Sequence, residues 1–462
     1  MCISHHNPLF HGKREADMTL PYDALPAHQV ALQRLQAIGV LRIIEEAVQQ
    51  HGPLVRLQFA GSEDLVILGA AEHVRFWQNH YDSFAKEIST LPSSSAVGRI
   101  LLGDALTFAA DGDEWRKGRR LTMPLVSPRL DTIQLALTDS AEWLVAQFQS
   151  GAVNSLRDVC GEWAVRAVMP PFMGQVFSLQ ESKLFAAEIH KAFFDLIQKA
   201  TTSNRETLLQ APELLKIRQK MNDMVDRAIA NMNNEPDTML AALYRAMEID
   251  QHPSQKSSLV NLVIGNLSGS IDNPATSLQW CLIHLAQHPE VQARIRQEAA
   301  GLDYRNWSIQ KCPVTLAAVR ECLRLTPVSS LIERTTRQRV EIEGYLLPPG
   351  VNVMFSPWLV HRNAQLWPEP LRFDIDRFLH DTVPTHHFFP FGTGKRNCVG
   401  MTLSLNQLTI TLSRLALSCR WQVAASTRAL DLRPQFDLNL APRGDVALTA
   451  SPLERVPVLL TP

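Results

Sequence analysis

The sequence lacks the charge and hydrophobic features of nucleic-acid-binding and membrane proteins. Its 462 residues carry a formal net charge of -1 at pH 7, so there is no global positive field to attract nucleic acid. No stretch approaches the roughly 18 apolar residues of a membrane-spanning helix, and the apolar run Leu259–Ile264 is interrupted by Asn261. Residues 1–15 are polar and lack the apolar segment of a signal peptide. We therefore expect a cytoplasmic protein without a membrane anchor.

Cysteine is scarce and irregularly spaced. Its seven positions are an odd number and include no Cys-x-x-Cys pair, which argues against a disulfide framework, a zinc site or an iron–sulfur cluster. Scattered thiols of this kind fit a reducing compartment. The cysteines are Cys2, Cys160, Cys281, Cys312, Cys322, Cys398 and Cys419.

Local patterns predict a chain dominated by helices. Helical patterns prevail from about residue 113 to 325. Two apolar runs around a Gly-Ser turn predict a hairpin over residues 53–70. Short strands are expected over residues 340–357 and near the C-terminus, and a helix over residues 399–417. Length alone would suggest two or three domains, but no internal repeat or low-complexity linker divides the chain.

One cysteine stands out because of its neighbours. The segment Phe391–Gly400 reads Phe-Gly-Thr-Gly-Lys-Arg-Asn-Cys-Val-Gly. Its glycines let backbone N–H groups approach the sulfur of Cys398 closely. Lys395 and Arg396 favour the thiolate, which is the form that binds a metal and is an axial ligand of haem iron. The alternative is a buried structural cysteine in a glycine-rich turn.

This segment fills all the defining positions of Phe-x-x-Gly-x-Arg-x-Cys-x-Gly and resembles the haem-binding loop of the cytochrome P450 family. The resemblance implies a mainly α-helical fold with small β-sheets, in one domain over residues 31–462 behind a tail of residues 1–30. It also implies haem b as the cofactor, with Cys398 as the ligand of its iron. The cofactor-binding residues of the loop would be Phe391, Gly394, Arg396, Cys398 and Gly400.

Glu321 and Arg324 lie in a helical pattern that must end before Pro327. Their spacing places both charges on one face of the helix, and taken alone the pair would be a solvated surface pair. The pair also matches the Glu-x-x-Arg motif of the family. Arg377, in the later segment Phe-Asp-Ile-Asp-Arg-Phe, would then complete a structural triad that supports the cysteine loop.

Four residues are candidates to hold the haem propionates. Trp115 and Arg119 match the family's Trp-x-x-x-Arg and share one helical face. The indole N–H and the guanidinium fork are suitable donors to a carboxylate. Arg334 matches another propionate-binding position, and Arg396 is the fourth candidate. Each arginine alone could equally lie on the surface.

Residues 257–288 predict a long helix, which the resemblance places across the distal haem face. The segment Gly269–Asn273 matches the family pattern Ala/Gly-Gly-x-Asp/Glu-Thr, so Asp272 corresponds to the acid of the proton-delivery pair. Asn273 stands where the family usually has threonine. An amide donates and accepts hydrogen bonds, but it relays a proton less easily than a hydroxyl.

Pro274 follows Asn273 directly. Proline has no N–H and its ring crowds the carbonyl four residues earlier, which belongs to Ser270. We infer a kink, and we hypothesise that the Ser270 carbonyl and hydroxyl hold the water chain that threonine would otherwise organise. The alternative is an ordinary proline-kinked helix without a catalytic role.

Residues near the substrate follow from their positions relative to these motifs. Their apolar character predicts a hydrophobic small-molecule substrate, although plain core packing would explain each residue alone. The loop over residues 89–102 is a further candidate segment. The predicted substrate-binding residues are Leu267, Ile271, Val328, Leu331 and Leu438.

The resemblance implies a monooxygenase, an oxidoreductase that inserts one oxygen atom from O₂ into the substrate. Because no flavin or iron–sulfur segment is recognisable, electrons are expected from a separate ferredoxin or flavodoxin. Arg116, Lys117, Arg120 and Lys395 could attract such an acidic partner, or could form an ordinary solvated face. Asn273 leaves open a peroxide-dependent oxygenase or a hydroperoxide isomerase. A non-catalytic haem protein is the remaining alternative.

Overall fold

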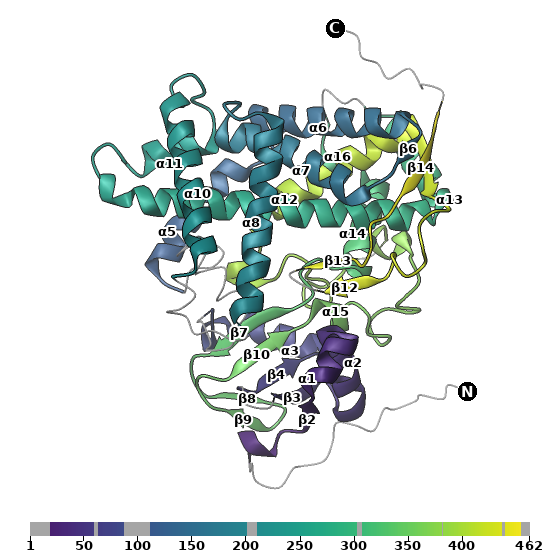
Figure 1. The fold of residues 1–462 in the computed structure, drawn as a ribbon. Coiled ribbons are helices and arrows are strands. Elements are labelled where there is room, and N and C mark those ends of the chain that lie inside the picture. The colour runs from purple at the N-terminus through teal and green to yellow at the C-terminus, as the bar shows by residue number, and fades with distance from the viewer. Residues whose placement is uncertain are drawn as a thin grey trace.

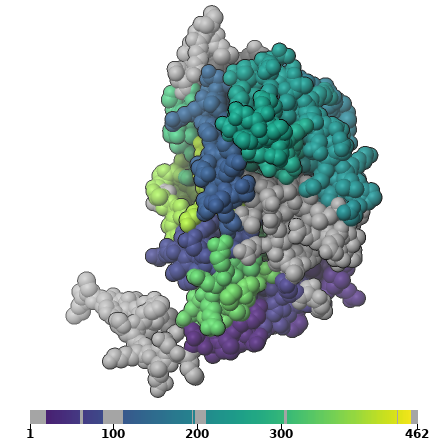
Figure 2. Space-filling model, turned by 90° about the vertical axis from the view of Figure 1, so that its left-hand side faces the viewer, coloured from purple at the N-terminus to yellow at the C-terminus, as the bar shows by residue number. Residues whose placement is uncertain are grey.

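The computed structural model describes residues 19–59, 63–86, 111–200, 210–302, 307–380, 382–436 and 439–453. A large helical region occupies one end of the molecule and a smaller region of strands the other (Figure 1). Figure 2 shows the same division, with the purple and light-green residues of the strand region together below the teal helices. The mainly α-helical fold with small sheets that the sequence predicts is therefore confirmed.

The helical region packs around α12, whose long central stretch is buried on most of its circumference. No helix among the described residues is both long and apolar enough to cross a membrane. The helices of this region are α5 (Asp113–Thr122), α6 (Asp131–Gln149), α7 (Leu156–Met173), α8 (Leu179–Ala200), α10 (Pro212–Asn231), α11 (Met239–Ala246), α12 (Lys256–Ala286), α13 (Pro289–Ala300), α14 (Pro313–Leu325) and α16 (Met401–Ser418).

The strand region joins segments that are far apart in the sequence. Its main sheet has the order β2-β3-β4-β10-β7-β5, in which β3 and β4 form the predicted antiparallel hairpin. The strands are β2 (Ala27–Val30), β3 (Leu54–Phe59), β4 (Leu65–Leu68), β5 (Phe84–Ala85), β7 (Ile332–Thr336) and β10 (Asn352–Phe355). The helices beside them are α1 (Leu32–Ile38), α2 (Val40–His51), α3 (Ala71–Asn79) and α15 (Pro357–Val360).

Three smaller sheets complete the fold. One has the order β1-β9-β8, another β11-β14-β6, and β12 with β13 forms a two-stranded hairpin. The strands are β1 (Leu20–Pro21), β8 (Val340–Ile342), β9 (Tyr345–Leu347), β6 (Ala152–Val153), β11 (Cys419–Val423), β14 (Leu448–Pro452), β12 (Pro434–Phe436) and β13 (Leu440–Pro442).

The sequence favours a tail that extends to residue 30, and the structure corrects this boundary. Ala27–Val30 pairs in parallel with Arg56–Phe59, and both Leu25 and Val30 are buried. The backbone N–H and C=O groups at the edge of β3 gain partners by this pairing, and burial of the two side chains adds to it. The domain therefore begins about ten residues earlier than the composition suggested.

Buried tryptophans fix α12 to its neighbours through their indole N–H groups. Trp280 of α12 donates to the Leu440 carbonyl of β13 at 2.7 Å. Trp421 of β11 donates to the Leu282 carbonyl of α12 at 3.0 Å. Because a buried donor without a partner is costly, the first bond fixes the β12–β13 hairpin against α12 and the second fixes β11 against it.

Candidate active site

The loop that carries Cys398 is a tight turn that depends on glycine. Gly392 and Gly394 have φ values of 70° and 69°, a left-handed conformation that side chains disfavour. A Cβ on Gly394 would lie 2.8 Å from the Tyr81 ring, so the site also needs the missing side chain. The Cys398 N–H donates to the Phe391 carbonyl at 2.9 Å and closes the turn.

Cys398 is the one exposed thiol among the six cysteines that lie in the described part of the chain. Protein still surrounds its sulfur closely enough that burial raises the pKa of the thiol, while the Gly400 N–H and the Arg119 charge act in the opposite direction. Helix α16 begins directly after Gly400, and a helix N-terminus favours a thiolate. A metal would replace the thiol proton and use the same stabilising groups.

Arg119 binds the cysteine loop itself. Its Nη1 donates to the Asn397 carbonyl at 2.8 Å and its Nη2 to Asn397 Oδ1 at 2.5 Å. This contact fixes the end of α5 beside the residue that precedes Cys398. The sequence reasoning assigned Arg119 to a propionate and did not foresee this bond, because the side chains lie 278 positions apart.

Arg396 lies against Trp115 and Asp111. Its guanidinium is 4.4 Å from the centroid of the Trp115 ring, and its Nε donates to Asp111 Oδ1 at 2.5 Å. The Nη2 atom of Arg396 is buried and has no hydrogen-bond partner among the residues that the structure describes. A buried guanidinium donor of this kind is suited to a carboxylate ligand.

Two further cations, the buried Arg334 and the partly buried Lys86, lie in the same cluster. Burial lowers the pKa of Arg334 to about 10 and that of Lys86 to about 7, and the charge of Arg396 acts in the same direction on both. Asp111 and Glu333 offset part of this positive charge. Sequence reasoning found Arg334 and missed Lys86, which follows the short strand β5 and carries no motif.

The cluster fits a dianionic cofactor. Lys86, Arg119, Arg334 and Arg396 outnumber the neighbouring acids Asp111 and Glu333, and a buried guanidinium donor remains available. Haem carries two propionates, and the thiol of Cys398 beside the cluster is suited to its iron. No group of three or more His, Cys, Asp or Glu side chains that could hold a metal gathers within the described ranges.

One face of α12 lies toward α5. Asn266 Nδ2 donates to Thr122 Oγ1 of α5 at 3.3 Å, which fixes this face. Gly269 and Asn273 lie one and two turns further along the same face and are both exposed. The Asn273 amide makes a long contact of 3.4 Å with the Gly269 carbonyl. A Cβ on Gly269 would meet no atom within 4 Å, so the space beside this turn of α12 is open.

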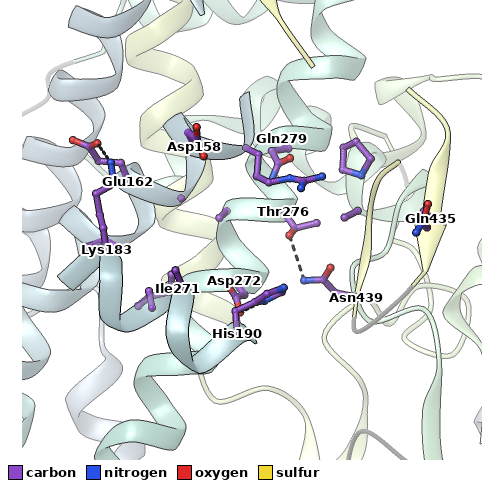
Figure 3. A pocket seen from close by; sticks show the side chains of 18 of the residues that line it. Asp158, Glu162, Lys183, His190, Ile271, Asp272, Thr276, Gln279, Gln435 and Asn439 are labelled. Carbon is purple, nitrogen blue, oxygen red and sulfur yellow. Dashed lines mark hydrogen bonds and ion pairs between the residues drawn. The ribbon is translucent and has the colours of Figure 1, made fainter. Parts of the chain in front are cut away.

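Asp272 points away from that face into a pocket of about 430 Å³ between α7, α8, α12 and the β12–β13 hairpin, lined by both apolar and polar side chains. Its Oδ2 lies 3.0 Å from Nδ1 of His190 on α8. Figure 3 shows the two side chains next to each other on the pocket lining. Helix α12 continues through Pro274, which is buried. Because Pro274 has no N–H, it cannot bond the Ser270 carbonyl.

The predicted substrate residues that the structure describes lie on α12 and beside the β12–β13 hairpin, where the Leu440 N–H donates to the Val328 carbonyl at 3.0 Å. Ile271 lines the pocket, whereas Leu267 is fully buried in the main core and is not part of this lining. Leu267 lies about 200° around the helix from Gly269, so it points to the opposite side. Val328 is buried and Leu331 packs near Leu440. Leu438 and residues 89–102 lie outside the described residues.

The pocket lining mixes apolar side chains with charged and amide groups. The charged and amide side chains reach it from α7, α8, α12 and the β12–β13 hairpin. The polar lining residues include Asp158, Glu162, Lys183, Gln279, Gln435 and Asn439 (Figure 3).

Glu321 and Arg324 form a fully buried, two-bonded pair rather than a solvated surface pair. Arg324 Nε and Nη2 each donate to the Glu321 carboxylate at 2.7 Å. Arg377 Nε lies 3.5 Å from Glu321 Oε1, and the Asp374 N–H donates to the same oxygen at 2.9 Å. Burial raises the pKa of Glu321 and the Arg324 contact opposes it. The three triad residues are thus brought together.

His361 links this network to the cysteine loop. The carbonyl of His361 accepts from Arg324 at 2.7 Å, and its Nε2 accepts the Phe389 N–H at 3.0 Å. Burial holds the pKa of His361 well below its usual range, so the ring is neutral and can act as the acceptor. Sequence reasoning missed this residue, because its two partners lie in other segments of the chain.

Comparison with known proteins agrees with this geometry. The family model for cytochrome P450 matches residues 21–446. A putative cytochrome P450 135B1 of Mycobacterium tuberculosis is 28% identical over 410 residues, which cover 81% of this chain and 80% of that protein. The (+)-vincadifformine 19-hydroxylase of Catharanthus roseus is 25% identical over 454 residues, 87% of each chain.

Two other similarities are limited, the first in the length matched and the second in sequence identity. Cyclooctatin synthase of Streptomyces melanosporofaciens is 29% identical over 252 residues, so the match spans about half of each protein, 53% of this chain and 52% of that one. The structure of retinoic acid bound cyanobacterial CYP120A1 superposes with a TM-score of 0.79 at 21% sequence identity, over 93% of this chain and 99% of that chain. At this identity the superposition shows the fold alone.

A thiol at the start of a helix, a cationic cluster for carboxylates and this fold define a haem-thiolate enzyme. The chain belongs to the cytochrome P450 family, and it is an oxidoreductase of the monooxygenase type. The family implies haem, a small-molecule substrate and a redox partner.

Proposed function

We propose that the protein is a haem b monooxygenase that inserts one oxygen atom from O₂ into a hydrophobic small molecule, with electrons from a separate ferredoxin or flavodoxin. The main support is the accessible Cys398 thiol, which has the Gly400 N–H and the Arg119 charge beside it. When bound, haem supplies the activation of O₂ and the transfer of oxygen to the substrate. The prediction of a cytoplasmic location remains untested.

The residues of the cysteine side bind and orient the cofactor in this proposal. Cys398 provides the thiolate, and the buried Nη2 of Arg396 provides a donor to a propionate. The Trp115 ring packs against the Arg396 guanidinium. Arg334 and Lys86 add positive charge that favours carboxylates. Phe391, Gly394 and Gly400 shape the loop, because Gly394 occupies a position where a side chain would meet Tyr81.

In this proposal, residues of α12 admit protons and order water. Asp272 holds an acidic group at the pocket, where water has access, and Asn273 offers an amide on the exposed face one residue later. Ser270 contributes a hydroxyl and a carbonyl that Pro274 cannot bond. We assign Asp272 to proton entry and Asn273 with Ser270 to ordering water, since an amide donates hydrogen bonds but does not give up a proton readily.

The basic patch for the redox partner is partly paired within the protein. Arg116 bonds Asp113 at 2.6 Å and Lys395 bonds Asp82 at 3.0 Å, both on the surface. Lys117 donates to Gln255, and Arg120 is exposed. Exposed pairs of this kind are worth about 1 kcal/mol or less, so an acidic partner can compete for these cations.

The peroxide-dependent alternative has only Asn273 in its favour, and the comparisons give it no support. A direct test separates the two reactions. A screen of hydrophobic metabolites for a substrate-induced spin-state change would first supply a ligand. We then expect oxygen from isotopically labelled O₂ in the product when NADPH, a surrogate ferredoxin and its reductase are present. Product formed only from added peroxide would overturn the proposal.

A further inference from the structure

The pocket contains an ion pair that joins α8 to α12. His190 on α8 and Asp272 on α12 meet at 3.0 Å, and both side chains are about half exposed, at 48% and 42%. The contact lies at the pocket lining, so water reaches both groups (Figure 3). Asp272 directly precedes Asn273, whose side chain is exposed on the neighbouring face of α12. The pair therefore lies between pocket water and that face.

The other charges around His190 are mostly paired with one another. Glu162 of α7 bonds Lys183 at 2.7 Å and Arg166 at 2.9 Å. On α8, Lys191 pairs with Asp195, and Glu188 pairs with Lys220 of α10. The remaining charged groups of the pocket lining are Arg157 and Asp158 of α7 and Arg443 after β13. Asp272 thus contributes a carboxylate directly to His190 across the two helices.

The wall opposite α8 is fixed. Thr276 lies one helical turn after Asp272, and Asn439 donates to its hydroxyl at 3.3 Å. Trp280 bonds the Leu440 carbonyl one turn further along α12. The hairpin side of the pocket is thus hydrogen-bonded to α12, while the α8 side meets Asp272 through an imidazole, a group that can both accept and donate a proton.

We propose that His190 is a positioning and relay residue that supplies protons to Asp272 from the pocket, an inference that rests on the proposed function. Neutral His190 that carries its hydrogen on Nδ1 accepts a proton from pocket water at Nε2, and the resulting imidazolium gives the Nδ1 proton to Asp272 Oδ2. Rotation of the ring then restores the starting arrangement. The net change is one proton moved from solvent to Asp272, with no electron transferred. Proton supply to α12 then becomes faster as the pH falls through the range in which histidine titrates.

Nuclear magnetic resonance of isotopically labelled histidine tests the pair without turnover. The protein is studied as the diamagnetic carbon monoxide complex of its reduced haem form, and His190→Gln identifies the resonance. We expect Asp272→Asn to move the His190 titration to lower pH, because a neighbouring carboxylate favours the charged imidazole. His252→Gln is the matched control, since His252 lies 3.6 Å from the surface residue Glu248 and outside the pocket lining. An unchanged His190 titration in Asp272→Asn would overturn the proposal.

Oxygen consumption driven by NADPH, a surrogate ferredoxin and its reductase provides the second readout. We expect the wild-type rate to rise toward acidic pH and His190→Gln to be about tenfold slower, with a flat pH profile. His252→Gln should keep the wild-type profile. A wild-type profile in His190→Gln would contradict the relay. If no variant consumes O₂, the proposed function fails, whereas the resonance titration still decides whether His190 and Asp272 are coupled.

Discussion

The cysteine side and the α12 side of the site are built in different ways. The cysteine loop is held by short contacts from the partly buried Arg119, the buried His361 and the buried pair Glu321–Arg324. The α12 side presents the half-exposed pair His190–Asp272 on the lining of a pocket. Buried pairs are costly to break, whereas exposed pairs change stability little. We infer that the first side determines whether the protein folds around its cofactor, and the second determines how fast protons arrive.

The largest effect is expected from breaking the buried pair. Arg324→Ala should destabilise the protein by about 3–5 kcal/mol, because it leaves the Glu321 carboxylate buried without its main partner. Urea unfolding followed by circular dichroism measures this change. Arg372→Ala is the matched control, since Arg372 and Glu369 have the same spacing but are 61% and 70% exposed. Equal losses in both variants would remove the distinction between buried and exposed pairs.

A smaller effect is expected in the cationic cluster. Arg396→Gln should lower haem affinity about tenfold, equivalent to about 1.4 kcal/mol, because it removes a charged donor that is suited to a propionate. Transfer of haem to an acceptor protein such as apomyoglobin measures the loss. Arg116→Gln serves as the control, since Arg116 is exposed and pairs with Asp113. Haem retention as in the wild type would contradict the assignment of this cluster to the cofactor.

Acid sensitivity should come from buried histidines rather than from the exposed pocket. Burial lowers the pKa of His284 to about 3. An unfolded histidine titrates near 6.5, so the unfolded state binds the proton first and stability falls as the pH drops from about 6.5 toward 3. His284→Gln should reduce this dependence by up to about 1.4 kcal/mol per pH unit.

Unfolding midpoints measured in urea from pH 7 to pH 4 would check this expectation, with His252→Gln as the exposed control. A pH dependence that His284→Gln leaves unchanged would show that His284 is not a source of the acid sensitivity. His361 acts in the same direction, because burial also lowers its pKa. A substitution of His361 would also leave the Phe389 N–H without its acceptor, so its effect on stability would combine two causes.

The smallest effect on stability is expected at Asp272. Asp272→Asn removes a half-exposed pair and should change the free energy of unfolding by about 1 kcal/mol or less. We expect Asp272→Asn to change the rate of proton delivery much more than it changes stability. A loss of stability comparable to that of Arg324→Ala would mean that the two sides of the site do not differ as described.

The cysteine side could be predicted from the sequence because its residues lie in short motifs. The loop Phe391–Gly400 and the spacing of Glu321 and Arg324 were both visible before the fold was known. The same is true of the long helix α12 and of the hairpin β3–β4. In each of these cases the signal is local, as a glycine-rich turn, a charge spacing or a hydrophobic period.

Residues that act through distant contacts were not predictable in this way. His190 and Asp272 lie 82 positions apart and meet only because α8 packs beside α12. His361 joins two segments, and Lys86 carries no motif. The orientation of α12 about its axis depends on Asn266 bonding Thr122, a contact that periodicity does not show.

The carbon monoxide spectrum of the reduced protein tests the bond between Cys398 and haem iron most directly. We expect the strongly red-shifted Soret band that a thiolate ligand gives, and its loss in Cys398→Ser. Cys419→Ser, which changes a buried thiol in β11, should keep the shifted band. A folded, haem-loaded wild-type protein whose band lies at the position of an ordinary histidine-ligated haem would contradict the account.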